Sequence, residues 1–194
     1  MLHLYIMALA TLTSATTYRL TVYAPGTEVD GADIDASANG FYLGLSEPST
    51  YCPVVPVGAA CPAVQGTLVY DGMSAMAVEV PGGQAIYVAP NGQIKYTQAH
   101  SAYMPTGSLV GGWFNKTVVS HCVPDTNVLD FLATDGSNRG GIMLCPDAPS
   151  FMEGTGASYQ LYAMTTHFNV SNCVEAIGIV QHKSGANYGA WQYT

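Results

Sequence analysis

Two carboxylates stand inside apolar runs of the sequence, a setting that suits general acid catalysis. Glu79 lies in the run MAVEV and Glu175 in the run VEAIGIV. A carboxyl group that points inward from a strand is desolvated, and its pKa rises into the range where it can protonate a leaving group. Paired carboxylates of this kind hydrolyse glycosidic bonds. We expect instead that each side chain points outward or is hydrogen-bonded in the core, so a carboxylate-dependent hydrolase is an alternative prediction.

Residues 83–103, GQAIYVAPNGQIKYTQAHSAY, combine one lysine, one histidine and three tyrosines. Such residues could line an active site, or they could form a β-hairpin that performs no chemistry. Apolar and polar residues alternate on both sides of the segment PNG (residues 90–92), where proline presets φ while asparagine and glycine tolerate positive φ. Ile86 and Val88 would then face one side of the strand and Tyr87 the other. The pattern predicts the hairpin.

The remaining reactive residues do not complete a catalytic or metal-binding motif. Ser46, in GLSEP, lacks the second glycine of the G-x-S-x-G nucleophile motif. The adjacent pair His121-Cys122 has no C-x-x-C or H-x-x-H partner at metal-ligand spacing. The acidic segment DGADID (residues 30–35) does not follow the EF-hand order and reads as a solvated loop. The glycine pairs in PGG and NRGG do not open a helix after a strand, as a phosphate-binding loop does. We therefore expect no metal and no cofactor.

The aromatic residues support a different hypothesis, contact with carbohydrate. The chain has thirteen tyrosines and two tryptophans, Trp113 and Trp191. Aromatic rings on a β-sheet surface can stack on the apolar faces of sugars while nearby polar groups bind the hydroxyls. The same alternation fits packing in a core. A carbohydrate-binding module for chitin or β-glucan is thus a second alternative, with both tryptophans as candidate sugar contacts.

The composition limits the partners. Of 194 residues, 48% are hydrophobic and 9% are charged, with a formal net charge of −8. An average soluble domain has about 25% charged residues. The five basic residues are scattered along the chain, so no basic patch is expected to neutralise a row of phosphates. Nucleic acid and anionic membranes are therefore poor partners, whereas cell-wall polysaccharide or a host receptor remains open.

The N-terminus has the features of a secretory leader. Residues 4–12 are largely apolar, and residues 13–15 (TSA) form an acceptable cleavage site, although no Lys or Arg precedes the apolar run. The run is too short to span a bilayer. We predict a signal peptide over residues 1–17, with an N-terminal core strand or helix as the alternative.

The five cysteines are typical of an oxidising compartment. Cys52 and Cys61 flank a short Pro/Val/Gly-rich loop and can pair locally. Cys145 and Cys173 are the natural second pair, since they join the end of one predicted strand to the start of a later one. Other pairings remain open. In this scheme Cys122 is left free or links two chains, which makes a homodimer plausible.

Two sequons agree with export from the cell. They are Asn115-Lys116-Thr117 and Asn169-Val170-Ser171, so Asn115 and Asn169 are candidate glycosylation sites.

Short β-type runs recur along the chain, separated by turn signals such as PGG, APNG, TDGSNRGG and EGTGAS. The runs are YRLTVYA, FYLGL, TLVY, MAVEV, AIYV, QIKY, SLVGGWF, LDFLA, GIMLC, YQLYAM and VEAIGIVQH. This spacing predicts a single all-β domain, a β-barrel or β-sandwich stapled by disulfides. We expect a β core over residues 67–194, with residues 18–66 adding N-terminal strands and the disulfide-stapled loop.

Several stretches together resemble a known family. FYLGLSEPSTYCP, LDFLATDG with GIMLCPD, YQLYAMTTHFNVSNCVEAIGIV and the terminal GAWQYT are similar to secreted ascomycete proteins described as IgE-binding or PhiA-like cell-wall proteins. Small elicitor-like proteins secreted by filamentous fungi look similar too. The resemblance implies secretion, a location in the cell wall or culture filtrate, a β-rich fold and no known enzymatic site. The family's cysteines match Cys145 and Cys173, which supports pairing them.

These observations together predict a non-catalytic, secreted, cell-wall-associated fungal protein. Recognition by a host, as an elicitor or antigen, is part of the same prediction.

Overall fold

The computed structural model describes residues 15–120, 124–146, 149, 152 and 154–194. Residues 1–14 of the predicted signal peptide lie outside this range, and so does Cys122.

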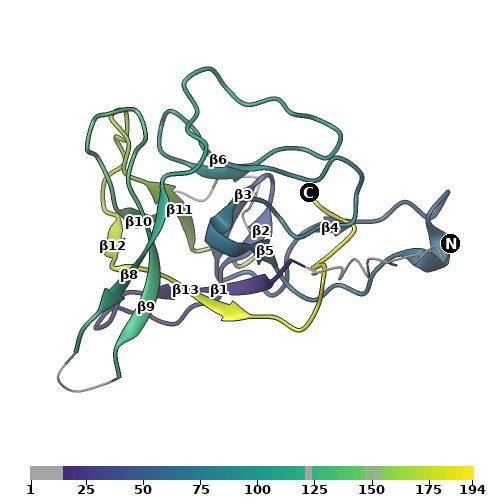
Figure 1. Cartoon of the computed structure of the whole chain (residues 1–194), viewed down its shortest axis with the longest axis horizontal. Coiled ribbons are helices and arrows are strands. Elements are labelled where there is room, and N and C mark those ends of the chain that lie inside the picture. Colours follow the sequence, from purple (N-terminus) through teal and green to yellow (C-terminus); the bar gives the residue numbers. More distant parts are fainter. Residues whose placement is uncertain (1–14, 121–123, 147–148, 150–151, 153) are drawn as a thin grey trace, which may run out of the picture.

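Two antiparallel sheets and a small two-stranded sheet make up the structure (Figure 1). The first sheet has the order β5 (Val69–Tyr70), β1 (Thr17–Tyr23), β13 (Gly178–Lys183), β9 (Thr126–Phe131) and β8 (Trp113–Val118). The second has the order β12 (Val174–Ala176), β10 (Ile142–Cys145), β11 (Tyr159–Ala163), β3 (Gly40–Leu43), β7 (Ile94–Tyr96) and β6 (Ile86–Val88), with β2 (Asp35–Ser37) paired to β3. The third pairs β14 (Gln192–Tyr193) with β4 (Thr50–Tyr51). The 3₁₀ turns η1 (Gly58–Ala60) and η2 (Asp71–Met73) lie between strands.

The all-β fold class predicted from the turn-punctuated runs is confirmed. One hydrophobic core takes side chains from both large sheets, including Leu20 and Ile179 of the first and Phe41 and Leu161 of the second. Two disulfides staple the domain. The two large sheets thus share one continuous hydrophobic core.

The strands of residues 18–66 and those of residues 67–194 are interleaved. β1 lies between β5 and β13, and β3 lies between β11 and β7. The strands of residues 18–66 thus pair directly with strands of residues 67–194 in both large sheets.

The hairpin predicted at residues 86–96 is present. β6 and β7 pair from Ile86↔Tyr96 to Val88↔Ile94. The turn uses the expected chemistry, because Gly92 adopts a φ of 92° and the Asn91 side chain accepts a hydrogen bond from the Gln93 amide. A Cβ at residue 92 would also lie 2.6 Å from a backbone carbonyl, so glycine is required there.

Two stretches that are continuous in the sequence divide between the two large sheets. LDFLA and GIMLC bridge at Leu132↔Gly140 next to the turn, but β9 then joins the first sheet and β10 the second. The run VEAIGIVQH divides in the same manner, with β12 in the second sheet and β13 in the first. The chain changes sheet at Gly178, where a Cβ would lie 2.6 Å from the Val128 side chain. Gly178 thus permits the close approach of β13 to β9, its neighbour in the first sheet, at the point where the run changes sheet.

A buried polar clamp fixes the C-terminal strand. Gln84 is 1% exposed, and its amide donates to the carbonyls of Thr97 and Tyr193 and accepts from the Tyr193 amide. The run MAVEV lies next to this clamp but forms isolated bridges rather than the predicted strand, one of them being Val78↔Ala190. Its hydrogen bonds go to several different segments in turn, so no continuous ladder can form.

The segment between β7 and β8 arches over β6, at the top of Figure 1. Val88 and Leu109 exchange two backbone hydrogen bonds of 2.8 and 2.9 Å, which hold the returning part of this segment beside β6. The first part of the segment, residues 97–104, forms the rim of the site described next.

Candidate functional site

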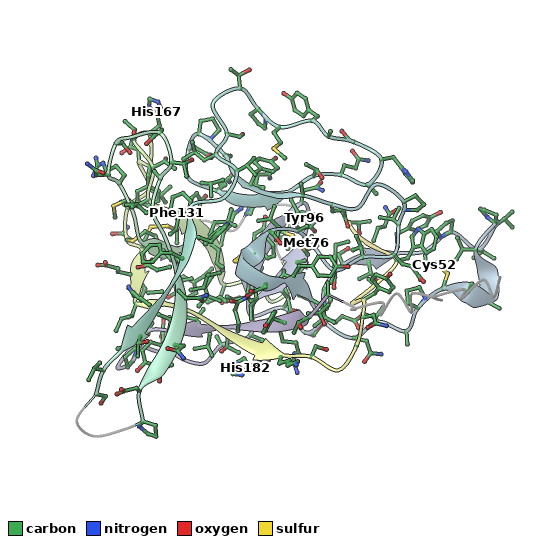
Figure 2. The ribbon with its side chains drawn as sticks, in the orientation of Figure 1. Cys52, Met76, Tyr96, Phe131, His167 and His182 are labelled. Carbon is green, nitrogen blue, oxygen red and sulfur yellow. A yellow bond between two sulfur atoms is a disulfide. The ribbon has the colours of Figure 1, made fainter. Side chains whose placement is uncertain are left out.

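The two disulfides join the pairs that the sequence favours. The structure links Cys52 to Cys61 and Cys145 to Cys173. Figure 2 shows Cys52 at the right-hand side of the molecule, away from the central core around Tyr96. Cys122, proposed as a free or intermolecular thiol, lies outside the described residues.

The two sequon asparagines are both exposed. Asn115 lies on β8, the edge strand of the first sheet, and Asn169 lies in the loop before β12. Their side chains are accessible for modification, and glycosylation stays a prediction.

The tryptophans face the core rather than the solvent. Trp113 and Trp191 are both partly buried against the hydrophobic cluster, and the Trp113 ring packs edge-on against Phe131 with the centroids 5.2 Å apart. This placement reduces the ring area that either tryptophan can offer to a sugar.

The carboxylates proposed as general acids point outward. Glu79 and Glu175 are exposed. Neither lines any of the surface depressions described below. The inward orientation expected of a general acid inside an apolar strand is therefore absent at both residues, and this alternative loses its candidates.

The acidic segment 30–35 uses its carboxylates within the fold. Asp30 accepts a hydrogen bond from the Ala24 amide at 2.9 Å. Asp33 forms an ion pair of 3.1 Å with Arg19. Among the described residues, no group of three His, Cys, Asp or Glu side chains is arranged to hold a metal ion. Figure 2 places His167 and His182 at opposite sides of the molecule, so these two histidines cannot share a ligand.

A shallow depression beside Lys95 is the most promising site. Ile94 and Tyr96, the neighbours of Lys95 on β7, are buried in the core. Alternation along the strand therefore directs Lys95 to the opposite face of the sheet. Across the sheet Lys95 is flanked by Tyr87 and by Gly40. A Cβ at residue 40 would lie 3.1 Å from the Tyr42 hydroxyl, so the Tyr42 side chain occupies the place beside Gly40.

Three separate segments supply the wall of this depression, which has a volume of about 190 Å³. β6 and β7 provide tyrosine and lysine, the turn before β3 provides Asn39, and the overlying segment provides Gln98, Ser101 and Tyr103. The full lining is Asn39, Tyr87, Lys95, Tyr96, Thr97, Gln98, Ser101 and Tyr103. No carboxylate belongs to this set.

Local backbone contacts set the positions of the wall residues. The Asn39 carbonyl accepts a hydrogen bond from the Tyr96 amide, and Asn39 itself adopts a left-handed φ of 57°. The Ser101 hydroxyl accepts a hydrogen bond from the Tyr103 amide at 3.2 Å. Tyr103 remains 75% exposed, so its ring is available to a ligand.

Burial governs the electrostatics of the depression. It lowers the pKa of the Lys95 ammonium from its ordinary value of 10.5. It also raises the pKa of Tyr87, and the nearby Tyr103 adds to that effect. The depression thus presents a partly desolvated cation between neutral phenols and amides.

A second depression, of about 340 Å³, adjoins the first and shares Thr97 and Ser101 with it. It is lined mainly by small and apolar groups, with His100 as its titratable residue. The predicted hairpin stretch 83–103 therefore both forms the hairpin and lines two neighbouring depressions.

A depression on another side brings together the residue types of a hydrolase. Ser108, Asp135 and His167 line it, from three different loops. The Asp135 carboxylate accepts hydrogen bonds from the Ser137 amide and the Thr166 hydroxyl, and the contacts with Ser137 lower its pKa. No hydrogen bond joins His167 to either of the other two in the described part of the chain, so the geometry of an activated nucleophile is not formed.

Sequence reasoning did not select Lys95 as a site residue. The available signal was a single charge inside an otherwise neutral, tyrosine-rich hairpin. Only the tertiary structure shows that Asn39 and Tyr103 lie beside Lys95 and form a depression with it.

The described residues contain no helix long and apolar enough to cross a membrane. Fold and surface together define a class: a disulfide-stapled, all-β domain with shallow polar and aromatic depressions.

The chain belongs to the family of PhiA-like secreted proteins, whose family model matches residues 18–194. An uncharacterised secreted protein of Arthroderma benhamiae is 37% identical over 181 residues, which cover 90% of this chain and 85% of that relative. No solved structure shows a significant match. The predicted resemblance and the secreted location are confirmed.

Proposed function

We propose that this secreted protein is a non-catalytic component of the fungal cell wall that associates with wall polysaccharide. The observation that carries the proposal is the Lys95 depression, with an exposed Tyr103 ring beside polar amides and hydroxyls. An aromatic face can cover the apolar side of a sugar ring, while amides and hydroxyls bind its hydroxyl groups.

The shape of the depression supports binding of a polymer rather than enclosure of a small substrate. It is shallow, and its volume of about 190 Å³ is below the roughly 300–1,000 Å³ of clefts that enclose drug-sized ligands. A single sugar unit of a longer chain can lie in such a depression while the rest of the chain continues over the surface.

The low surface charge agrees with a location within a polysaccharide matrix. Charged residues make up 9% of the chain, so hydroxyl and amide groups must provide most of the surface hydration. Two disulfides keep the domain folded in an oxidising environment.

A sedimentation assay tests the proposal. The oxidised, full-length secreted protein is mixed with insoluble chitin, insoluble β-glucan or washed fungal cell walls, and its depletion from the supernatant is measured. We expect depletion by at least one of these materials and weaker depletion for Tyr103→Ala.

Tyr51→Ala is the matched control, because Tyr51 is also an exposed tyrosine, at 55%, but lies on β4. Retention by none of the three materials would refute the proposed association. Equal losses for both variants would show that the Lys95 depression is not the contact surface.

Host recognition and a homodimer through Cys122 stay predictions from the sequence. The first is tested by applying the purified protein to host cells and measuring a defence or antibody response. The second is tested by electrophoresis of the protein with and without reductant.

A further inference from the structure

The five basic residues of the chain occupy different environments. Arg19 and Lys116 form ion pairs with Asp33 and Asp130. Arg139 and Lys183 are exposed to solvent. Lys95 is half-buried, and no carboxylate or hydrogen-bond acceptor among the described residues contacts its ammonium group. In a chain with a net charge of −8, an unpaired and partly buried cation is unexpected.

An ammonium group has three hydrogen-bond donors that require acceptors. Partial burial removes some of its water, and no residue that the structure describes supplies a replacement acceptor. A carboxylate or phosphate is the acceptor that compensates best, because charge-assisted hydrogen bonds are about twice as strong as neutral ones. The Lys95 environment therefore favours an anionic ligand group.

The surroundings restrict that ligand further. The lining contains one cation, so it matches a single negative charge rather than a dense row of charges. Asn39 and Gln98 offer amides that can donate to and accept from hydroxyl groups. Tyr103, at 75% exposure, offers a ring face. One carboxylate on a polyhydroxylated ring satisfies all three features, and this is the structure of a hexuronic acid residue.

We propose that the Lys95 depression binds uronic acid units of acidic polysaccharides, with the sugar carboxylate on the Lys95 ammonium and the sugar ring against Tyr103. This inference rests on the proposed polysaccharide association and names its chemical class. The net negative charge of the protein disfavours densely charged polymers. Screening within about 8 Å at physiological ionic strength still permits an isolated contact at Lys95.

Isothermal titration of the oxidised protein with tri-galacturonic acid, compared with neutral galactotriose, tests the proposal. We expect tri-galacturonic acid to bind at least about tenfold more tightly, consistent with loss of one charge-assisted contact in the neutral sugar. Bound tri-galacturonic acid should also protect Lys95 from acetylation, as measured by mass spectrometry of the digested protein.

Three variants separate the role of the charge from that of the fold. Lys95→Met keeps the length of the side chain but removes the ammonium, and it should weaken binding of tri-galacturonic acid by about tenfold or more. Lys95→Arg should retain most of the binding. Lys183→Met, at an exposed lysine, should leave it unchanged. Because Lys95→Met removes an unpaired, partly buried charge, its melting temperature should not fall.

Each outcome bears on the inference. Equal affinity for the charged and neutral trisaccharides, or unchanged binding in Lys95→Met, would overturn it. Absence of binding to tri-galacturonic acid, together with retention of the protein on cell walls, would overturn the uronate site and leave the proposed wall association intact. Failure of both assays would reject both.

Discussion

The hydroxyl of Tyr193 joins the C-terminal strand to the core, and Tyr193→Phe removes it while keeping the ring. This hydroxyl accepts a hydrogen bond from the Leu68 amide at 2.9 Å and donates one to the Gly66 carbonyl at 2.8 Å. Tyr193 is 1% exposed and Leu68 is 0% exposed, so water cannot easily replace the lost oxygen at the amide.

The loss of stability in Tyr193→Phe can be estimated from the two lost hydrogen bonds. A buried amide left without a partner costs about 1–3 kcal/mol. The Gly66 carbonyl is half-buried, so loss of its donor adds about 0.5–1 kcal/mol. The free energy of unfolding should therefore fall by about 1.5–4 kcal/mol. At about 2–4 °C per kcal/mol for a chain of this size, a loss near 3 kcal/mol lowers the melting temperature by roughly 6–12 °C.

Thermal and urea denaturation followed by circular dichroism measure this change, and two tyrosines serve as controls. Tyr96→Phe loses one hydrogen bond of 3.2 Å, to the Thr194 carbonyl, and should cost about 0.5–1.5 kcal/mol. Tyr159→Phe loses an exposed hydrogen bond to Glu28 and should change stability by less than about 0.5 kcal/mol. If Tyr193→Phe is no less stable than Tyr159→Phe, the assigned role of the buried hydroxyl is wrong.

The remaining predictions concern packing, pH and the disulfides. Gly178→Ala should lower the free energy of unfolding by about 1–3 kcal/mol in urea denaturation, because its Cβ would overlap the neighbouring strand. Gly185→Ala, which meets no atom within 4 Å, is the control and should be nearly neutral. Burial raises the pKa of Asp35 above 3.8 despite a hydrogen bond that lowers it. The native state therefore holds this proton at higher pH than the unfolded chain, and its contribution to stability falls as pH rises from about 3.8 through the native pKa. Asp35→Asn should accordingly be more stable than the wild type at neutral pH, with the difference vanishing near pH 3; an equal difference at both pH values would contradict this. Replacing both cysteines of Cys145–Cys173 by serine should destabilise the protein by about 3.6 kcal/mol, against about 2.6 kcal/mol for Cys52–Cys61, because the closed loops span 28 and 9 residues. Chemical denaturation of the two double variants measures the difference, and the reverse order would refute the loop-length argument.

The candidate site was only partly accessible from the sequence. The sequence predicted a hairpin in the stretch 83–103 rather than the lining of a site. The hairpin is confirmed, and residues of the same stretch also line two surface depressions. Trp113 and Trp191 were selected because their rings suit sugars, yet the fold packs both against the core. A linear sequence does not say which aromatic residues remain exposed, since burial depends on the strands that cover them.

Local chemistry determined much of the fold. Alternation along residues 86–96 and the turn PNG define the β6–β7 hairpin, because strand pleating and positive φ at glycine act over only a few residues. The short apolar runs likewise determined the all-β class. The spacing of the cysteines favoured the two disulfide pairs that the structure contains.

Tertiary packing decided the rest. Which sheet each strand joins, and the change of sheet at Gly178, depend on contacts with segments about 50 residues away, such as Val128. The isolation of Lys95 depends on the absence of a carboxylate from three converging segments, including Asn39 and Tyr103. Long-range proximity of this kind has no local signature, because it results from burying many apolar side chains together in one core.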